Sequence, residues 1–180
     1  MVTIRITKAV KAPMDRCFRL ARSIDLQRVS RGAAAVPTEG RVSGLIGPGE
    51  TVTWQSGSSL KTRINAYRPP SYYCELVEGA DLSYEHEHHF APFNDGTRIR
   101  EEIRLTPKGL FGRIAMRLYL RKRLVRQVEQ HIAMLKQVAE SEEWHTYLDG
   151  QPDFDLRPQA VTTTASQNPS SGQTMRQQVG

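Results

Sequence analysis

The sequence contains few cysteines and no long apolar run. Only Cys17 and Cys74 are present among 180 residues, too few for the disulfide framework of a small secreted domain. No stretch approaches the roughly 18 consecutive apolar residues of a transmembrane helix. Basic residues interrupt the first apolar stretch, which excludes a signal-type segment there. We therefore expect a soluble, cytoplasmic protein with reduced thiols.

The composition changes near residue 149. A chain of this length suits one domain, whose core needs neither metal nor disulfides. Residues 149–180 consist mainly of Gln, Ser, Thr, Pro and Gly with few apolar side chains. Such a segment cannot offset the entropy lost on ordering. The sequence predicts one folded domain over residues 1–148 and a disordered polar tail over residues 149–180.

Alternating side chains indicate strands, and the first runs from Val2 to Lys8. Two short helices follow, one over Met14 to Ala21 and one capped by Ser23 or Asp25. Residues 30–49 look like a loop. Five more strands are predicted at Glu50 to Trp54, Leu60 to Tyr67, Tyr72 to Val77, Leu82 to Phe90 and Thr97 to Leu105. The Asn94-Asp-Gly96 segment predicts a hairpin turn between the last two.

After Gly109 the apolar pattern changes to a helical period. One stripe continues for about seven turns and ends near residues 140–143. Its members are Ile114, Leu118, Val125, Val128, Ile132, Leu135 and Ala139. A helix of that length needs a large apolar surface, and the antiparallel sheet is the available one. The predicted fold is therefore α+β, with a curved sheet wrapped round a long C-terminal helix.

The segment from Leu82 to Phe90 contains three histidines and two glutamates. Alternation places one set of side chains on the inner face, namely Leu82, Tyr84, His86, His88 and Phe90. In the next strand Glu101 shares a face with Ile99 and Ile103, so it also points inward. A buried carboxylate needs a partner. We expect Glu101 to pair with His86 or His88.

Three interpretations of this cluster remain open. The histidines and Glu101 can form a satisfied polar cluster in an apolar interior, or they can orient a ligand in a pocket. They can also perform acid–base catalysis or bind a metal through His86, His88 and Glu101. A His-x-His pair on a strand is a weak metal signal, so we expect neither metal nor cofactor.

Trp54 and Cys74 are two further candidates on strands. Trp54 lies on an inner face, where its indole packs in the core or stacks on a flat ligand. The alternation in the next but one strand suggests that Tyr72 and Cys74 share its inner face. No pattern pairs Cys74 with a base, so we assign it no catalytic role.

The segment from Arg104 to Arg126 has eight basic residues and no carboxylate, in a chain of net charge +6. It is either a solvated helix face or a patch that docks on anionic lipid or a partner. The docking candidates are Arg113, Arg117, Arg121, Lys122 and Arg123. Nucleic acid fits less well, because the segment lacks a recognised reading motif. The location would then be cytoplasmic and peripheral to the membrane.

The order of several short motifs resembles the START-like superfamily over about residues 2–140. They are Ala12-Pro13, Cys17-Phe18, Gly44-Leu45-Ile46-Gly47-x-Gly49-Glu50-x-Val52-Thr53-Trp54, Pro69-Pro70, Glu78-Gly79, His86-x-His88-x-Phe90 and Gly96-Thr97. More narrowly, the chain is similar to bacterial SRPBCC ligand-binding proteins of the polyketide cyclase/dehydrase and coenzyme Q-binding type. Some of those relatives are labelled cell-division-inhibitor-like.

This resemblance implies a helix-grip fold with seven strands, the seventh near Ala34 to Val42. It also implies a cavity between sheet and helix for lipids, quinones or polyketides. By position, the residues lining that pocket would be Trp54, His86, His88, Thr97 and Glu101, with Tyr84 and Phe90 as apolar walls. Cys74 stands where relatives often have aspartate, which would remove an inward acid.

The sequence thus favours a non-catalytic protein that binds or carries a small hydrophobic ligand. The alternative is a cyclase or dehydratase in which an inward histidine acts as general base and Glu101 orients it. One fold hosts carriers and enzymes alike, so the resemblance does not choose between them.

Overall fold

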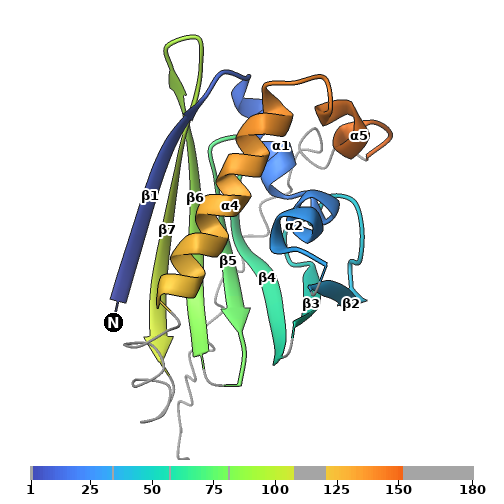
Figure 1. Ribbon diagram of the computed structural model, residues 1–180, viewed down its shortest axis with the longest axis vertical. Helices are drawn as coiled ribbons and strands as arrows, with labels where there is room; N and C mark the ends of the chain where they lie inside the picture. The colour runs from blue at the N-terminus through green and yellow to red at the C-terminus, as the bar shows by residue number, and fades with distance from the viewer. Residues whose placement is uncertain (1, 34, 57, 81, 108–120, 152–180) are drawn as a thin grey trace, which may run out of the picture.

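Figure 1 shows the computed structural model of the chain, which describes residues 2–33, 35–56, 58–80, 82–107 and 121–151. One antiparallel sheet has the order β1-β7-β6-β5-β4-β3-β2. Its strands are β1 (Val2–Val10), β2 (Val36–Gly40), β3 (Thr51–Ser56), β4 (Ser58–Arg68), β5 (Tyr72–Glu78), β6 (Leu82–Phe93) and β7 (Gly96–Pro107). The seven predicted strands are confirmed, and β2 lies where the resemblance placed the strand that alternation missed.

The described helices lie on the concave side of this sheet, with α4 running along it (Figure 1). They are α1 (Met14–Ala21), α2 (Ile24–Arg31), α4 (Arg121–Ala139) and α5 (Trp144–Leu148). Ile132 and Leu135 of α4 are fully buried. This arrangement confirms the α+β helix-grip fold. The predicted beginning of the long helix, with Ile114 and Leu118, lies outside the described residues, as does the tail beyond residue 151.

Individual residues determine the backbone conformation at the start of α2 and in the β6–β7 hairpin. The hydroxyl of Ser23 accepts a hydrogen bond from the Leu26 amide at 3.3 Å, which caps α2 as predicted. In the β6–β7 hairpin Asn94 has a φ of 52°, a conformation that Asn tolerates. A side chain on Gly96 would collide with the Val10 carbonyl, so glycine lets the end of β1 approach β7.

The core has two parts, one on each side of the polar cluster described below. Beneath α1 and α2, Phe18 packs against Tyr73 and Phe90 at centroid distances of 5.8 and 5.5 Å. Further along the same strands, Ile103 of β7 and Ile132 of α4 belong to a second apolar cluster. No helix among the described residues is long and apolar enough to cross a membrane.

Candidate functional site

A polar cluster occupies the inner face of the sheet at β6 and β7. His86, His88 and Glu101 all point inward, as alternation predicts, and their exposed fractions are 8%, 2% and 1%. The hairpin register places His88 directly opposite Glu101. Glu101 Oε2 lies 2.8 Å from His86 Nε2 in a hydrogen bond, and Oε1 lies 3.4 Å from His88 Nδ1. The predicted pairing of Glu101 with these histidines is therefore confirmed.

Strand β5 presents the opposite face from the one predicted. Tyr73 and Glu75 are buried on the inner face, whereas the ring of Tyr72 contacts His89 on the outer face at 5.0 Å. The prediction that Tyr72 and Cys74 point inward is wrong. Residues 72–77 are apolar at almost every position, so alternation carries little information there. An inward acid is thus present, but it is Glu75.

Glu75 completes the cluster next to His88. Its Oε2 lies 3.8 Å from His88 Nε2, within ion-pair distance. Its Oε1 is buried and has no hydrogen-bond partner among the described residues. The ring of Tyr73 stacks on His88 with centroids 4.1 Å apart, and its hydroxyl donates to the Ala21 carbonyl. His88 is therefore held between two carboxylates and under an aromatic ring.

Burial and charge together shift the pKa values of this cluster. Burial alone would lower the pKa of His88, but the charges and contacts of Glu101 and Glu75 outweigh it and raise the pKa to about 9. Burial would raise the pKa of the Glu101 carboxyl, yet His88 and His86 hold it far below its ordinary value. Burial, and then the His88 charge, lower the pKa of His86. At neutral pH His88 is charged and His86 is neutral.

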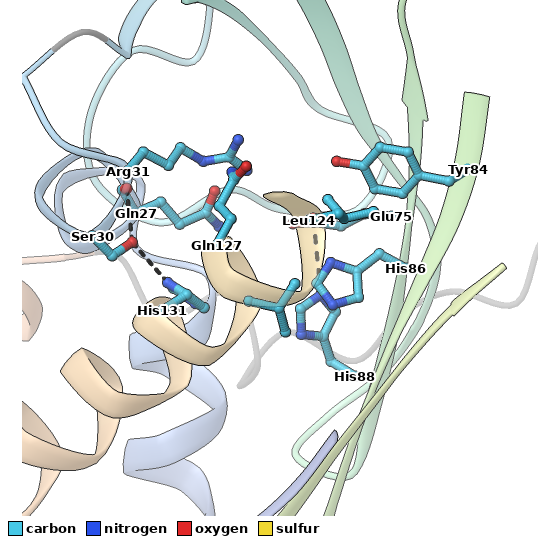
Figure 2. Close-up of a pocket in the computed structure, with 11 residues that line it drawn as sticks. Gln27, Ser30, Arg31, Glu75, Tyr84, His86, His88, Leu124, Gln127 and His131 are labelled. Carbon is cyan, nitrogen blue, oxygen red and sulfur yellow. Dashed lines mark hydrogen bonds and ion pairs between the residues drawn. The ribbon is translucent and has the colours of Figure 1, made fainter. Parts of the chain in front are cut away.

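Helix α4 contributes a third histidine, which the sequence analysis missed. His131 faces the cluster across a small pocket, and Ser30 of α2 lies 3.0 Å from its Nδ1 (Figure 2). Burial lowers the pKa of His131 to about 4, so its imidazole is neutral. His131 lies three residues after Val128 and four residues before Leu135, so the helical period places it on the inward face with the apolar stripe. The pocket between these groups measures about 30 Å³, which is enough to hold at least one water molecule.

A larger cavity adjoins this pocket, because Arg31, Tyr84, Leu124 and Gln127 line both. It measures about 340 Å³, within the usual range for small-molecule sites. Its apolar walls come from the sheet and from α4, namely Trp54, Leu60, Leu82, Tyr84 and Leu124. The site is thus a mainly apolar cavity with a polar end formed by Glu75, His86, His88 and His131.

The predicted pocket residues divide into three groups. Trp54 and Tyr84 line the cavity, and His86 and His88 line the polar pocket. Glu101 lies behind the histidines. Phe90 and Thr97 line neither space, because Phe90 packs on Phe18 and the Thr97 hydroxyl donates to the Ala12 carbonyl at 2.8 Å. Contact of the other five with a ligand stays a prediction.

Three groups have the spacing of a metal-binding set. Ligand atoms of Glu75, His86 and His88 all lie within 4.8 Å of one another. The set considered from the sequence had Glu101 in place of Glu75. A histidine whose second ring nitrogen faces a carboxylate is a common feature of metal sites. The same contacts also serve a protonated His88, which neutralises part of the negative charge without a metal.

The basic residues proposed for docking lie near the beginning of α4. Arg121, Lys122 and Arg123 are exposed, whereas Arg113 and Arg117 lie outside the described residues. Arg123 also lines the larger cavity. Docking to an anionic membrane or a partner stays a prediction.

A curved seven-stranded antiparallel sheet that holds a long helix over a cavity is a helix-grip fold. Solved structures of low sequence identity share the fold. Protein CV1439 from Chromobacterium violaceum is 13% identical, with a TM-score of 0.59 over 77% of this chain and 97% of that one. Protein Ms6760 from Mycobacterium smegmatis is 19% identical, with a TM-score of 0.57 over 76% and 89%.

The Aha1 dimer from Colwellia psychrerythraea is also similar, with 14% identity and a TM-score of 0.56 over 78% of this chain and 97% of that one. No family model and no curated protein matches the sequence. At these identities the likeness concerns the fold alone, and function has to be inferred from the residues of the site.

Proposed function

We propose that this domain binds and carries a small, largely apolar molecule in the cavity between α4 and the sheet. The main evidence is the cavity of about 340 Å³, which has mainly apolar walls and adjoins the small polar pocket. Burial of apolar ligand surface there would provide most of the affinity. The polar end would orient the ligand, since a few convergent polar groups fix orientation in such sites.

Trp54 supports a ligand with an acceptor group as well as an apolar body. Its side chain lines the cavity, yet its indole nitrogen is buried and has no hydrogen-bond partner among the described residues. An unsatisfied buried donor costs about 1–3 kcal/mol. A carbonyl or ether oxygen on the ligand could accept this hydrogen bond, so ligand binding would remove the cost. The same ring offers a flat surface for stacking.

Native mass spectrometry of the freshly purified chain tests this proposal. We expect a stoichiometric adduct that organic extraction releases as a mainly apolar compound. A chain that carries no adduct and binds no fatty acid, quinone or polyketide in a fluorescence screen would contradict it.

Two neighbouring substitutions provide the matched control. Ser56 lines the cavity, so Ser56→Phe places an aromatic ring inside it. Gln55 is the exposed neighbour on the same strand, and Gln55→Phe adds the same ring to the outer face. We expect the adduct to be lost from Ser56→Phe and kept by Gln55→Phe. Equal loss or equal retention would show that the ligand lies elsewhere.

A second candidate function is acid–base catalysis, and the neutral state of His86 favours it. Glu101 accepts a hydrogen bond from His86, and this leaves the other ring nitrogen available as a base. A cyclase or dehydratase needs such a base beside its substrate. In an enzyme, His86→Ala would abolish turnover of a polyketide-like substrate and leave its binding almost intact. In a carrier, the same change would alter affinity alone.

A further inference from the structure

Three arginines line the larger cavity, and no carboxylate does so among the described residues. Arg31 ends α2, while Arg123 and Arg126 lie on the first turns of α4 as the structure describes it. Arg123 and Arg126 are exposed, and Arg31 is half-buried. Positive charge therefore gathers where α2 and α4 border the cavity.

Arg123 and Arg126 make no ion pair with a carboxylate of the described residues, whereas Arg31 lines the small polar pocket together with Glu75. The guanidinium carbon of Arg31 lies 4.6 Å from the centre of the Trp54 ring, which positions the group over a cavity wall. Three cations around a cavity that no described carboxylate lines form a site for an anion.

The small polar pocket that adjoins the cavity offers hydrogen-bond acceptors. Glu75 lines this pocket together with His86 and His88, and Glu101 lies behind the histidines. Glu75 Oε1 has no described hydrogen-bond partner and can accept one. A hydroxyl group could donate a hydrogen bond to this oxygen, whereas a deprotonated acidic group could not. The arginines and this pocket together determine how a ligand with an acidic group must lie.

We propose that the ligand is an anionic amphiphile, whose acidic group lies against Arg31, Arg123 and Arg126 and whose apolar body fills the cavity. This inference rests on the proposed binding function and narrows it to one chemical class. Neutral quinones and alcohols of similar size would bind more weakly, because they leave the arginines without a counter-charge. The acidic group is a carboxylate or a phosphate.

Calorimetric titration of the full chain at neutral pH with matched probes tests the inference. Decanoic acid and decyl phosphate carry the two acidic groups, and decanol has a comparable chain without charge. We expect the better of the two acids to bind at least about tenfold more tightly than decanol, as a charge-assisted hydrogen bond predicts. The acid that binds more tightly identifies the headgroup.

Charge reversal locates the acidic group. Arg123→Glu and Arg126→Glu should each weaken binding of the preferred acid by roughly five- to tenfold, the effect of replacing an exposed ion pair by repulsion. Decanol affinity should be unchanged. Arg100→Glu makes the same change in net charge at an exposed position of β7 that lines neither cavity, so it should leave both affinities unaltered.

The outcomes separate this inference from the function on which it rests. Equal affinity for acids and alcohol would overturn the anionic ligand and leave hydrophobic binding in place. An acid preference that survives both arginine substitutions, or falls equally in Arg100→Glu, would overturn the assigned position. Failure of all three probes to bind would count against the inference and the proposed function together.

Discussion

At the scale of single residues, Glu101 organises the polar cluster. One carboxylate oxygen is hydrogen-bonded to His86, and the other lies at ion-pair distance from His88. All three side chains are buried, so water screens their charges weakly. Removing one member of such a set leaves the others with uncompensated charge, which costs more than the intact set contributes.

Glu101→Gln keeps the shape of the side chain and removes its charge. We expect it to lower the free energy of unfolding by about 3–5 kcal/mol, because His88 would remain charged with one partner fewer. Its neighbour Glu102 points outward to Arg5 at 2.8 Å and Arg104 at 3.2 Å, and Glu102→Gln should cost at most about 1 kcal/mol. Urea denaturation measures the free energy of unfolding of both variants. Similar losses in the two would contradict a stabilising role for the buried charge of Glu101.

The raised pKa of His88 predicts a dependence of stability on pH. A group whose pKa is higher in the folded state contributes stability that is complete below its unfolded value, 6.5, and is lost as pH rises through its folded value, about 9. Glu75 and Glu101 have lowered pKa values and stay ionised throughout this window. The unfolding free energy should therefore fall between pH 6.5 and pH 9.

Chemical denaturation across this window measures the fall. The His88→Gln variant should show a clearly smaller decrease than the native sequence. An NMR titration of the His88 ring provides a second readout that does not need the variant to fold. A ring that titrates below pH 6.5 would contradict the assigned charge.

At the scale of elements, α4 is the part that most closely follows the sequence pattern. Leu135 belongs to the predicted apolar stripe and is fully buried, whereas Gln137 is exposed on the same helix. Leu135→Ala should destabilise the protein by about 2–5 kcal/mol through the lost contacts and the cavity left behind. Gln137→Ala should change stability by no more than about 0.5 kcal/mol. Thermal and urea unfolding measure both, and a small loss for Leu135→Ala would argue against a helix held by the sheet.

The strands show how far alternation can be followed. In β6 apolar and charged residues alternate clearly, so the inward orientation of His86 and His88 could be predicted. In β5 nearly every position is apolar, and the orientation of Tyr73 and Glu75 depends on partners in neighbouring strands. Strand β2 contains glycine and proline and lacks an apolar face. Side-chain alternation therefore could not locate it, and only the resemblance to the START-like superfamily did.

At the scale of the whole molecule, the cavity is the feature that no local pattern contains. It forms where residues of β3, β4, β6 and α4 meet with the end of α2. The fold, Trp54 and the histidines of β6 could be predicted from sequence, whereas Glu75, His131 and the arginines bordering the cavity could not. Their roles depend on distances between segments far apart in the chain. The ligand class inferred from those arginines is therefore a result of the tertiary structure.

The two tryptophans offer a direct test of whether the cavity is a ligand site. Trp54 lines it, while Trp144 lies on α5 beside Arg16, whose guanidinium carbon is 4.3 Å from the ring centre. We would follow both indole N–H signals in ¹H–¹⁵N spectra during titration with decanoic acid, assigning them with Trp144→Phe. We expect a saturable shift of the Trp54 signal, while the Trp144 signal stays unmoved. A Trp54 signal that stays fixed while the protein binds the acid would show that the cavity is not the ligand site.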